Sequence, residues 1–93
     1  MSYRFRDWVV RDDMQAALDR YVHQGVRLGD FLSAVVSNDF QEACRRADND
    51  SLENLPAFAA YVYNEMPSTC HGSREIYRAW LKTHAKKREK ESA

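Results

Sequence analysis

The segment 55–81 constrains the fold of this chain more than any other part of it. It reads LPAFAAYVYNEMPSTCHGSREIYRAWL, in which two stretches with apolar residues at helical spacing flank a short polar corner. Pro67 disfavours a helical Met66 and therefore ends the first helix, and Pro56 fits only in the first turn of that helix, where its missing N–H is not needed. The second helix begins after Gly72-Ser73. The segment predicts a helical hairpin.

The rest of the chain carries further helix patterns. Gly (3) and Pro (2) are scarce, which favours helices over a fold of strands and turns. Apolar residues recur three and four apart over four expected helices, at 12–24, 31–37, 40–47 and 52–65. Gly25 is expected to end the first helix in a left-handed conformation. The run Ser37-Asn38-Asp39 favours a break between the second and third helices, and one continuous helix is the alternative.

Side-chain direction follows from the same spacing. Four residues of the third helix are expected to face inward: Phe40, Ala43, Cys44 and Ala47. Tyr63 belongs to the apolar stripe of the fourth helix. The fold class predicted is all-α, a compact bundle of four to five short helices with an N-terminal extended arm. The single helical domain spans 12–85, and a basic tail at 86–93 is expected to fray.

The arm covers residues 1–11. Tyr3 and Phe5 alternate with Arg4 and Arg6, which suits an extended backbone, and Trp8 can dock it on the helices. A lone strand would leave an unpaired edge unless a partner strand or groove received it. An irregular arm packed on the helices is therefore favoured over a strand.

Composition limits the cellular setting and the general partners. The 93 residues carry a net charge of zero, so nothing attracts the whole chain to nucleic acid or to an anionic membrane. The charge is unevenly placed, since every Asp lies at or before Asp50 and every Lys at or after Lys82. Two cysteines are too few for a disulfide scaffold, and no export signal or stretch of about 20 apolar residues is present. A cytoplasmic protein with reduced thiols is expected.

Candidate catalytic groups are few. Cys70 and His71 are immediate neighbours, whereas a catalytic pair usually brings together side chains from separate parts of a fold. The other cysteine and histidines are scattered singly, without the paired spacing of a zinc site. Asp48 and Asp50 lie in a loop too short for a calcium site. We expect no enzyme activity, no cofactor and no metal, with Cys70 packed in the corner.

Nucleic-acid binding is the alternative function. Helices at 31–37 and 40–47 resemble a helix-turn-helix in which Gln41, Arg45 and Arg46 would read DNA, but residues 30–53 hold six acidic residues against two arginines, which would repel phosphates. Local basic groups are better candidates for this alternative: Arg4, Arg6, Lys82, Lys86, Lys87 and Arg88. A solvated, fraying helix end whose cations suit the negative end of the helix dipole is the favoured explanation of the tail, because such charge runs are usually exposed.

Aromatic residues, 12% of the chain, favour protein binding. A domain this small cannot easily bury all of them, and Tyr and Trp are preferred interface anchors. The anchors predicted for a protein partner, or for a second copy of the chain in a homodimer, are Tyr3, Phe5, Trp8, Tyr61 and Tyr77. Half-buried residues at the rim of the core are the alternative explanation.

A longer pattern covers most of the chain. Its residues are Gly29-Asp30-Phe31-Leu32, Ala34-Val35, Asn38-Asp39, Arg46-Ala47-Asp48, Leu55-Pro56, Tyr63-Asn64, Pro67, Cys70, Gly72-Ser73 and Trp80-Leu81. This pattern resembles a family of small uncharacterised proteins of phages, prophages and other mobile elements. The resemblance implies a bacterial or phage origin and an accessory role, and it supplies no catalytic or binding residues. A non-catalytic accessory protein that acts by protein–protein binding, with a host or defence protein among the targets, is the function expected.

Overall fold

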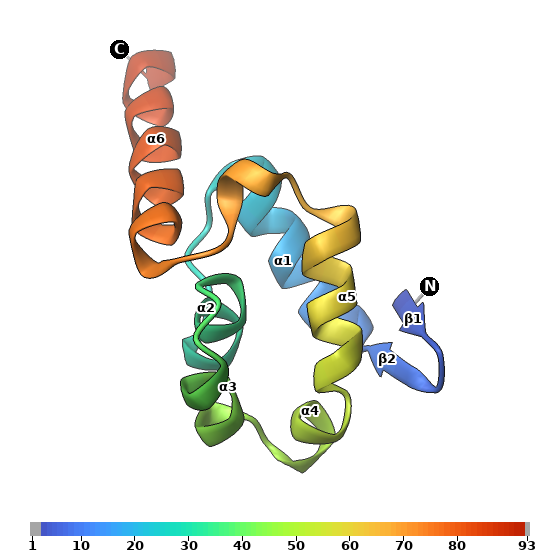
Figure 1. The fold of residues 1–93 in the computed structure, drawn as a ribbon. Helices are drawn as coiled ribbons and strands as arrows, with labels where there is room; N and C mark the ends of the chain where they lie inside the picture. The colour runs from blue at the N-terminus through green and yellow to red at the C-terminus, as the bar shows by residue number, and fades with distance from the viewer. Residues whose placement is uncertain (1–2, 93) are drawn as a thin grey trace.

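The computed structural model describes residues 3–92, and within this range the protein is all-α apart from one short hairpin. Residues 1, 2 and 93, which the predicted arm and tail include, lie outside the described residues. Figure 1 shows α2 and α3 facing α5, with α4 between their lower ends. The elements in chain order are β1 (Tyr3–Phe5), β2 (Trp8–Val10), α1 (Asp12–Gln24), α2 (Asp30–Val36), α3 (Phe40–Arg46), α4 (Asn49–Glu53), α5 (Leu55–Glu65), the 3-10 turn η1 (Ser68–Cys70) and α6 (Arg74–Ser92).

The N-terminal arm is a β-hairpin, so the expectation of an irregular arm was wrong. β1 and β2 pair antiparallel with Tyr3 opposite Val10 and Phe5 opposite Trp8. The tight turn between the strands places Arg6 at a left-handed φ of 54°. The arm thus supplies its own partner strand. The alternation of residues 3–6 alone does not predict this pairing.

The hairpin is fixed to two helices. The backbone N–H of Tyr3 donates to Oε1 of Gln15 on α1 at 3.0 Å, and the N–H of Val9 donates to Oδ1 of Asn54 at 2.9 Å. The ring of Tyr3 meets the ring of Tyr61 on α5 edge to face, with centroids 5.1 Å apart. These contacts place the hairpin on α1 and α5.

Helix α1 has the predicted bounds and the predicted end. Gly25 adopts a left-handed φ of 65° and its N–H donates to the carbonyl of Tyr21 at 2.9 Å. A Cβ at this position would stand only 2.2 Å from the Cβ of His84 on α6. Gly25 therefore serves both the helix end and the close approach of α6.

Helices α2 and α3 are separate, as the Ser37-Asn38-Asp39 run predicted. Asn38 has a left-handed φ of 60°, which a continuous helix does not allow. Asp39 then caps α3 by accepting a hydrogen bond from the N–H of Glu42 at 3.3 Å.

The expected single helix at 52–65 is two helices, α4 and α5. Asn54 lies between them with φ −103° and ψ 14°. Pro56 occupies the first turn of α5, as predicted, and its ring and missing N–H prevent α4 from continuing through this point. Asp48 caps α4 by accepting from the N–H of Ser51 at 2.7 Å.

The corner after α5 follows the predicted signals, and α6 extends further than expected. Met66 is extended, with φ −107° and ψ 145°, and Ser73 Oγ accepts from the N–H of Ile76 at 3.1 Å to cap α6. The helix continues to Ser92 and so includes most of the basic tail, whose Lys, Arg and Glu residues are good helix formers. Its far half projects beyond the other elements (Figure 1).

The core lies between α1, α2, α5 and the start of α6. Tyr21 and Phe58 are its largest fully buried side chains. Phe58 meets Phe31 of α2 edge to face at 5.0 Å, which joins α5 to α2. The other buried apolar residues include Val10, Leu18, Leu32, Ala34, Val36, Ala57, Tyr61, Val62, Met66, Cys70 and Tyr77.

Candidate functional site

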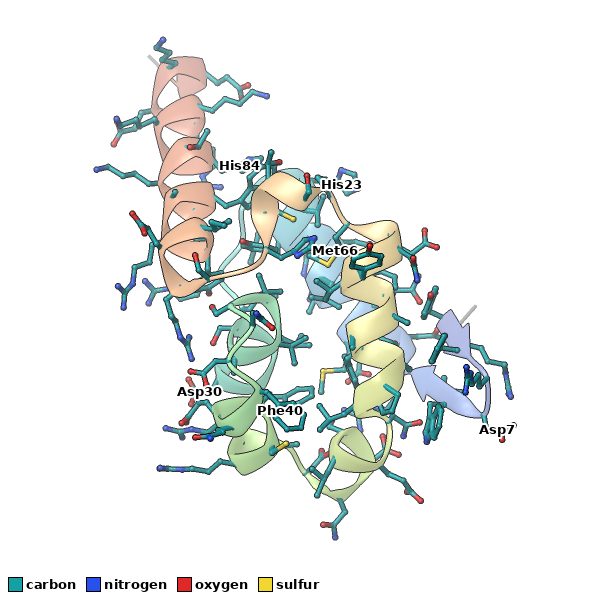
Figure 2. The ribbon with its side chains drawn as sticks, viewed as in Figure 1. Asp7, His23, Asp30, Phe40, Met66 and His84 are labelled. Atoms are coloured by element: carbon teal, nitrogen blue, oxygen red, sulfur yellow. The ribbon has the colours of Figure 1, made fainter. Side chains whose placement is uncertain are left out.

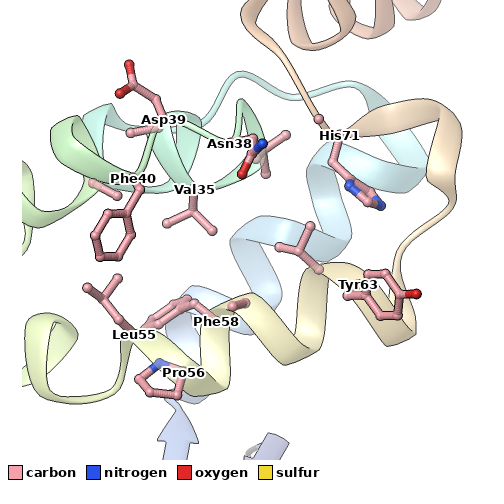
Figure 3. Close-up of a pocket in the computed structure, with 15 residues that line it drawn as sticks. Val35, Asn38, Asp39, Phe40, Leu55, Pro56, Phe58, Tyr63 and His71 are labelled. Atoms are coloured by element: carbon pink, nitrogen blue, oxygen red, sulfur yellow. The ribbon is translucent and has the colours of Figure 1, made fainter.

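An apolar groove with a volume of about 610 Å³ lies between α2–α3 and α5. Figure 3 shows its two walls, with Val35 and Phe40 on one side and Leu55 and Phe58 on the other. The apolar residues that line it are Ala34, Val35, Val36, Phe40, Ala43, Leu55, Pro56, Phe58, Ala59, Val62 and Tyr63. We call this the apolar groove; its volume is in the range of pockets that bind ligands.

Two aromatic side chains stand exposed at the groove. Phe40, at the start of α3, is 70% exposed, and Tyr63, near the end of α5, is 81% exposed. Both were expected to face the core, and both expectations were wrong. α3 begins at Phe40, two residues after the left-handed Asn38, so its first turn lies at the mouth of the groove while Ala43 takes the buried position.

The polar groups of the groove lie mainly near one end. His71 and Tyr63 are neighbours there in Figure 3. The Gly72 N–H donates to the Val36 carbonyl at 2.8 Å, which ties the corner to the end of α2 and positions the adjacent His71. Nε2 of His71 is buried and makes no hydrogen bond with another of the described residues. Asp39 also lines the groove and pairs with Arg74 at 3.5 Å.

Tyr61 and Tyr77, two of the predicted anchors, belong to the core. Tyr61 is 5% exposed and its hydroxyl donates to Oδ1 of Asp19 at 2.7 Å. Tyr77 is 7% exposed, and its hydroxyl oxygen accepts from the N–H of Leu28 at 3.0 Å. Burial and the hydrogen bond with Asp19 raise the pKa of Tyr61 above its ordinary value. The outward position expected for these two tyrosines was wrong, because both rings are buried and both hydroxyls make hydrogen bonds within the chain.

The other three predicted anchors lie on the hairpin. Tyr3, Phe5 and Trp8 are half-buried against the core. Phe5 and Trp8 stack with centroids 6.4 Å apart. The hairpin lies on the side of α5 away from the apolar groove (Figure 3), so the structure does not bring these residues to the groove.

The Cys70–His71 corner has the structural contacts expected of it. Cys70 is fully buried and its thiol donates to the Pro67 carbonyl at 3.1 Å. Burial raises the pKa of this thiol to about 11, so it stays protonated at neutral pH and is a poor nucleophile. Residues 3–92 contain no group of three or more His, Cys, Asp or Glu side chains that could hold a metal ion.

The predicted basic residues do not form one surface. Arg4 and Arg6 are on the hairpin, whereas Lys82, Lys86, Lys87 and Arg88 are on α6, at the opposite end of the molecule in Figure 1. Lys87 and Arg88 line a second cavity of about 500 Å³ together with His23 and His84. Figure 2 labels both histidines, His84 on α6 and His23 near the end of α1.

The helix-turn-helix interpretation gains little from the arrangement of α3. Nε of Arg46 binds the Glu42 carboxylate at 2.7 Å, and Nη1 approaches Asp30 at 3.5 Å. The hydrogen bond from Arg46 holds the pKa of Glu42 below its ordinary value. One of the two arginines proposed to read DNA is therefore already neutralised on the protein surface.

Sequence reasoning missed the apolar groove. Its one signal was the composition of α5, where LPAFAAYVY is apolar almost all around. A helix of that kind has more apolar surface than one core face can cover, which indicates a second contact surface. The two exposed aromatic residues at the groove, Phe40 and Tyr63, were predicted to face the core.

No described helix is long and apolar enough to cross a membrane. The comparisons with known proteins identify no relative of this chain. No family model matches the chain, and neither a curated protein nor a solved structure does.

Proposed function

We propose that the protein is a non-catalytic binding module whose apolar groove takes up an apolar segment of a partner protein. The observation that carries this proposal is the exposure of Phe40 and Tyr63 beside a groove of about 610 Å³ lined almost wholly by apolar side chains. Isolated exposed hydrophobic residues are normal, but a contiguous apolar hollow with aromatic residues at its rim is typical of interaction sites.

The wider role proposed is that of a cytoplasmic accessory protein of a phage or mobile element. The pattern from Gly29 to Leu81 supports it, and two free cysteines are consistent with a reducing compartment. The partner is then a host or phage protein, including components of defence machinery.

The test is capture of a partner from bacterial host lysate with a photo-crosslinking residue at Ala59, which lines the groove and is exposed. Thr83, exposed on α6, is the matched control position. We expect a stoichiometric partner crosslinked from position 59 and not from 83, and its loss in a Phe40→Ala/Tyr63→Ala variant. A strictly monomeric protein that yields no partner from either position would contradict the proposal.

Nucleic-acid binding by α6 is the second candidate. Lys82, Lys86 and Lys90 recur every four residues and share one exposed face of the helix. A gel shift with duplex DNA at two salt concentrations tests it, because a complex driven by charge weakens steeply as salt rises. Loss of binding in a Lys82→Glu/Lys86→Glu variant would support it, and no shift at low salt would contradict it.

A further inference from the structure

Resting on the proposed function, we infer that the occupant of the apolar groove is an amphipathic helix of the partner with positively charged residues at both ends. The groove walls are helices, so they offer no unpaired strand edge to an extended peptide. An extended segment would leave its own backbone N–H and C=O groups against apolar side chains, whereas a helix satisfies them internally.

The length of the groove fits a short helix. Along α5 its lining runs from Leu55 to Tyr63, eight residues apart, which is about 12 Å at 1.5 Å per residue. Apolar anchors at positions i, i+4 and i+7 of a partner helix span about 10 Å. Two turns of an apolar face therefore cover the groove, and the flanking turns of the partner extend beyond it.

The nearest charged residues along the chain beyond both ends of the groove's α5 lining are negative. Glu53 precedes Leu55 by two residues and Glu65 follows Tyr63 by two; both are exposed, and neither makes an ion pair with another of the described residues. Each carboxylate lies two residues along the chain from one end of this lining, so a cation on each end of the bound helix would be attracted toward one of them. Attraction of this kind selects among partners and speeds their encounter.

The charged residues of the wider segment 30–65 are also mostly negative. Between residues 30 and 65 the only basic residues are Arg45 and Arg46. The acidic residues of this segment are Asp30, Asp39, Glu42, Asp48, Asp50, Glu53 and Glu65. Arg11 and Arg74 reach three of them from outside, Asp50 and Asp48 at 3.2 and 4.0 Å and Asp39 at 3.5 Å, which leaves the surroundings acidic.

A second copy of the chain is a poorer occupant. A two-fold contact through the groove would bring two acidic rims together, which is repulsive. The chain has a basic helical segment of its own at 82–90, but Ala85 is its only apolar residue, so it cannot fill an apolar groove. The charge pattern therefore favours a different protein.

The experiment uses synthetic helical peptides of about 14 residues, long enough for the apolar turns and both charged ends. One has leucines at i, i+3, i+4 and i+7 with lysines at both ends; the second has glutamates in place of the lysines; the third has the lysine version in scrambled order. Affinities for the full chain are measured by fluorescence anisotropy at low and high salt. We expect the lysine peptide to bind about 10-fold or more tighter than the glutamate peptide at low salt, and the ratio to shrink at high salt.

Substitutions in the chain test where the peptides bind. Glu53→Gln/Glu65→Gln should weaken the lysine peptide several-fold at low salt without weakening the glutamate peptide, since both positions are exposed and their charge is what changes. Ala59→Arg should block both peptides. Val26→Ala, a truncation of an exposed apolar residue outside the groove, should change neither. Circular dichroism and melting temperature confirm that each variant is folded.

The outcomes separate this inference from the proposed function. Equal binding of the two charged peptides, both blocked by Ala59→Arg, would refute the basic helix and leave the protein-binding groove intact. Tighter binding of the glutamate peptide, or no preference for the lysine peptide over its scrambled form, would also overturn the inference. If no peptide binds, the inference is wrong, and if position 59 also captures no partner, the proposed function fails with it.

Discussion

The hydroxyl of Tyr21 donates a 2.7 Å hydrogen bond to the carbonyl of Cys70, 49 residues along the chain. Both residues are fully buried. The bond joins the middle of the core, on α1, to the corner between α5 and α6, and it satisfies a carbonyl at the end of η1 that no water can reach. This hydrogen bond and the burial of both residues lead to two predictions about the stability of the fold.

Replacing Tyr21 by Phe should destabilise the protein by about 1–3 kcal/mol, because the buried Cys70 carbonyl loses its donor while the ring is kept. Urea unfolding followed by circular dichroism measures the change. Tyr63→Phe is the matched control, because Tyr63 is 81% exposed. The free energy of unfolding of this variant should lie within about 0.5 kcal/mol of that of the unmodified protein. Equal unfolding midpoints for Tyr21→Phe and the control would refute this role of the hydroxyl.

The same buried groups make the protein less stable in alkali. Burial raises the pKa of the Cys70 thiol from 9.0 to about 11, and it also raises the pKa of Tyr21 and of Tyr61. The folded state therefore keeps these protons to higher pH than the unfolded state does. The associated stability is fully present below about pH 9 and declines as the pH rises toward 11 and beyond. Unfolding midpoints across this range should fall with pH, and a midpoint that rises would contradict the assignment.

The two thiols should differ in reactivity. Cys70 is fully buried and its raised pKa keeps it as a thiol, whereas Cys44 on α3 is partly exposed. Alkylation of the folded protein by iodoacetamide near neutral pH should label one cysteine per chain, and peptide mapping should place the label on Cys44. Both should react in denaturant. Rapid labelling of Cys70 in the folded protein would show that the corner opens.

Trp80 is partly buried, and its indole N–H donates to the Tyr21 carbonyl at 2.9 Å. Its ring lies 6.4 Å from that of Tyr21 and 5.0 Å from that of His84. Trp80→Ala should cost about 3 kcal/mol, the low end for a large aromatic residue because the ring is not wholly enclosed. Trp80→Phe, which keeps most of the ring contact and loses the hydrogen bond, should cost about half as much. A loss within measurement error for Trp80→Ala would assign Trp80 to a surface role.

Truncation after His84 should change the melting temperature by no more than about 2 °C, because residues 85–91 are exposed. A tertiary hydrogen bond of this segment runs from Arg88 to the Gln24 carbonyl and is itself exposed. Differential scanning calorimetry of the two chains measures the difference. A large drop would show that the far half of α6 stabilises the fold.

Local signals in the sequence determined most of the helix boundaries. Gly25 ends α1, the Asn38-Asp39 pair separates α2 from α3, and Pro67 ends α5, each as predicted. These outcomes depend on the backbone conformations open to one or two residues, which neighbours in sequence settle. The all-α class follows from the same signals together with the apolar spacing.

Only the tertiary structure decided which apolar residues are covered. Apolar spacing predicted that Phe40 faces the core, and Tyr61 was expected to be an anchor for a partner, yet Tyr61 is 5% exposed and Phe40 is 70% exposed. The difference depends on where α3 and α5 lie relative to each other, and their separation leaves the apolar groove open between them. The pairing of β1 with β2 and the hydrogen bond from Val9 to Asn54 are likewise contacts between segments that no local pattern specifies. Periodicity states which face of a helix is apolar, whereas burial depends on what the rest of the chain places against that face.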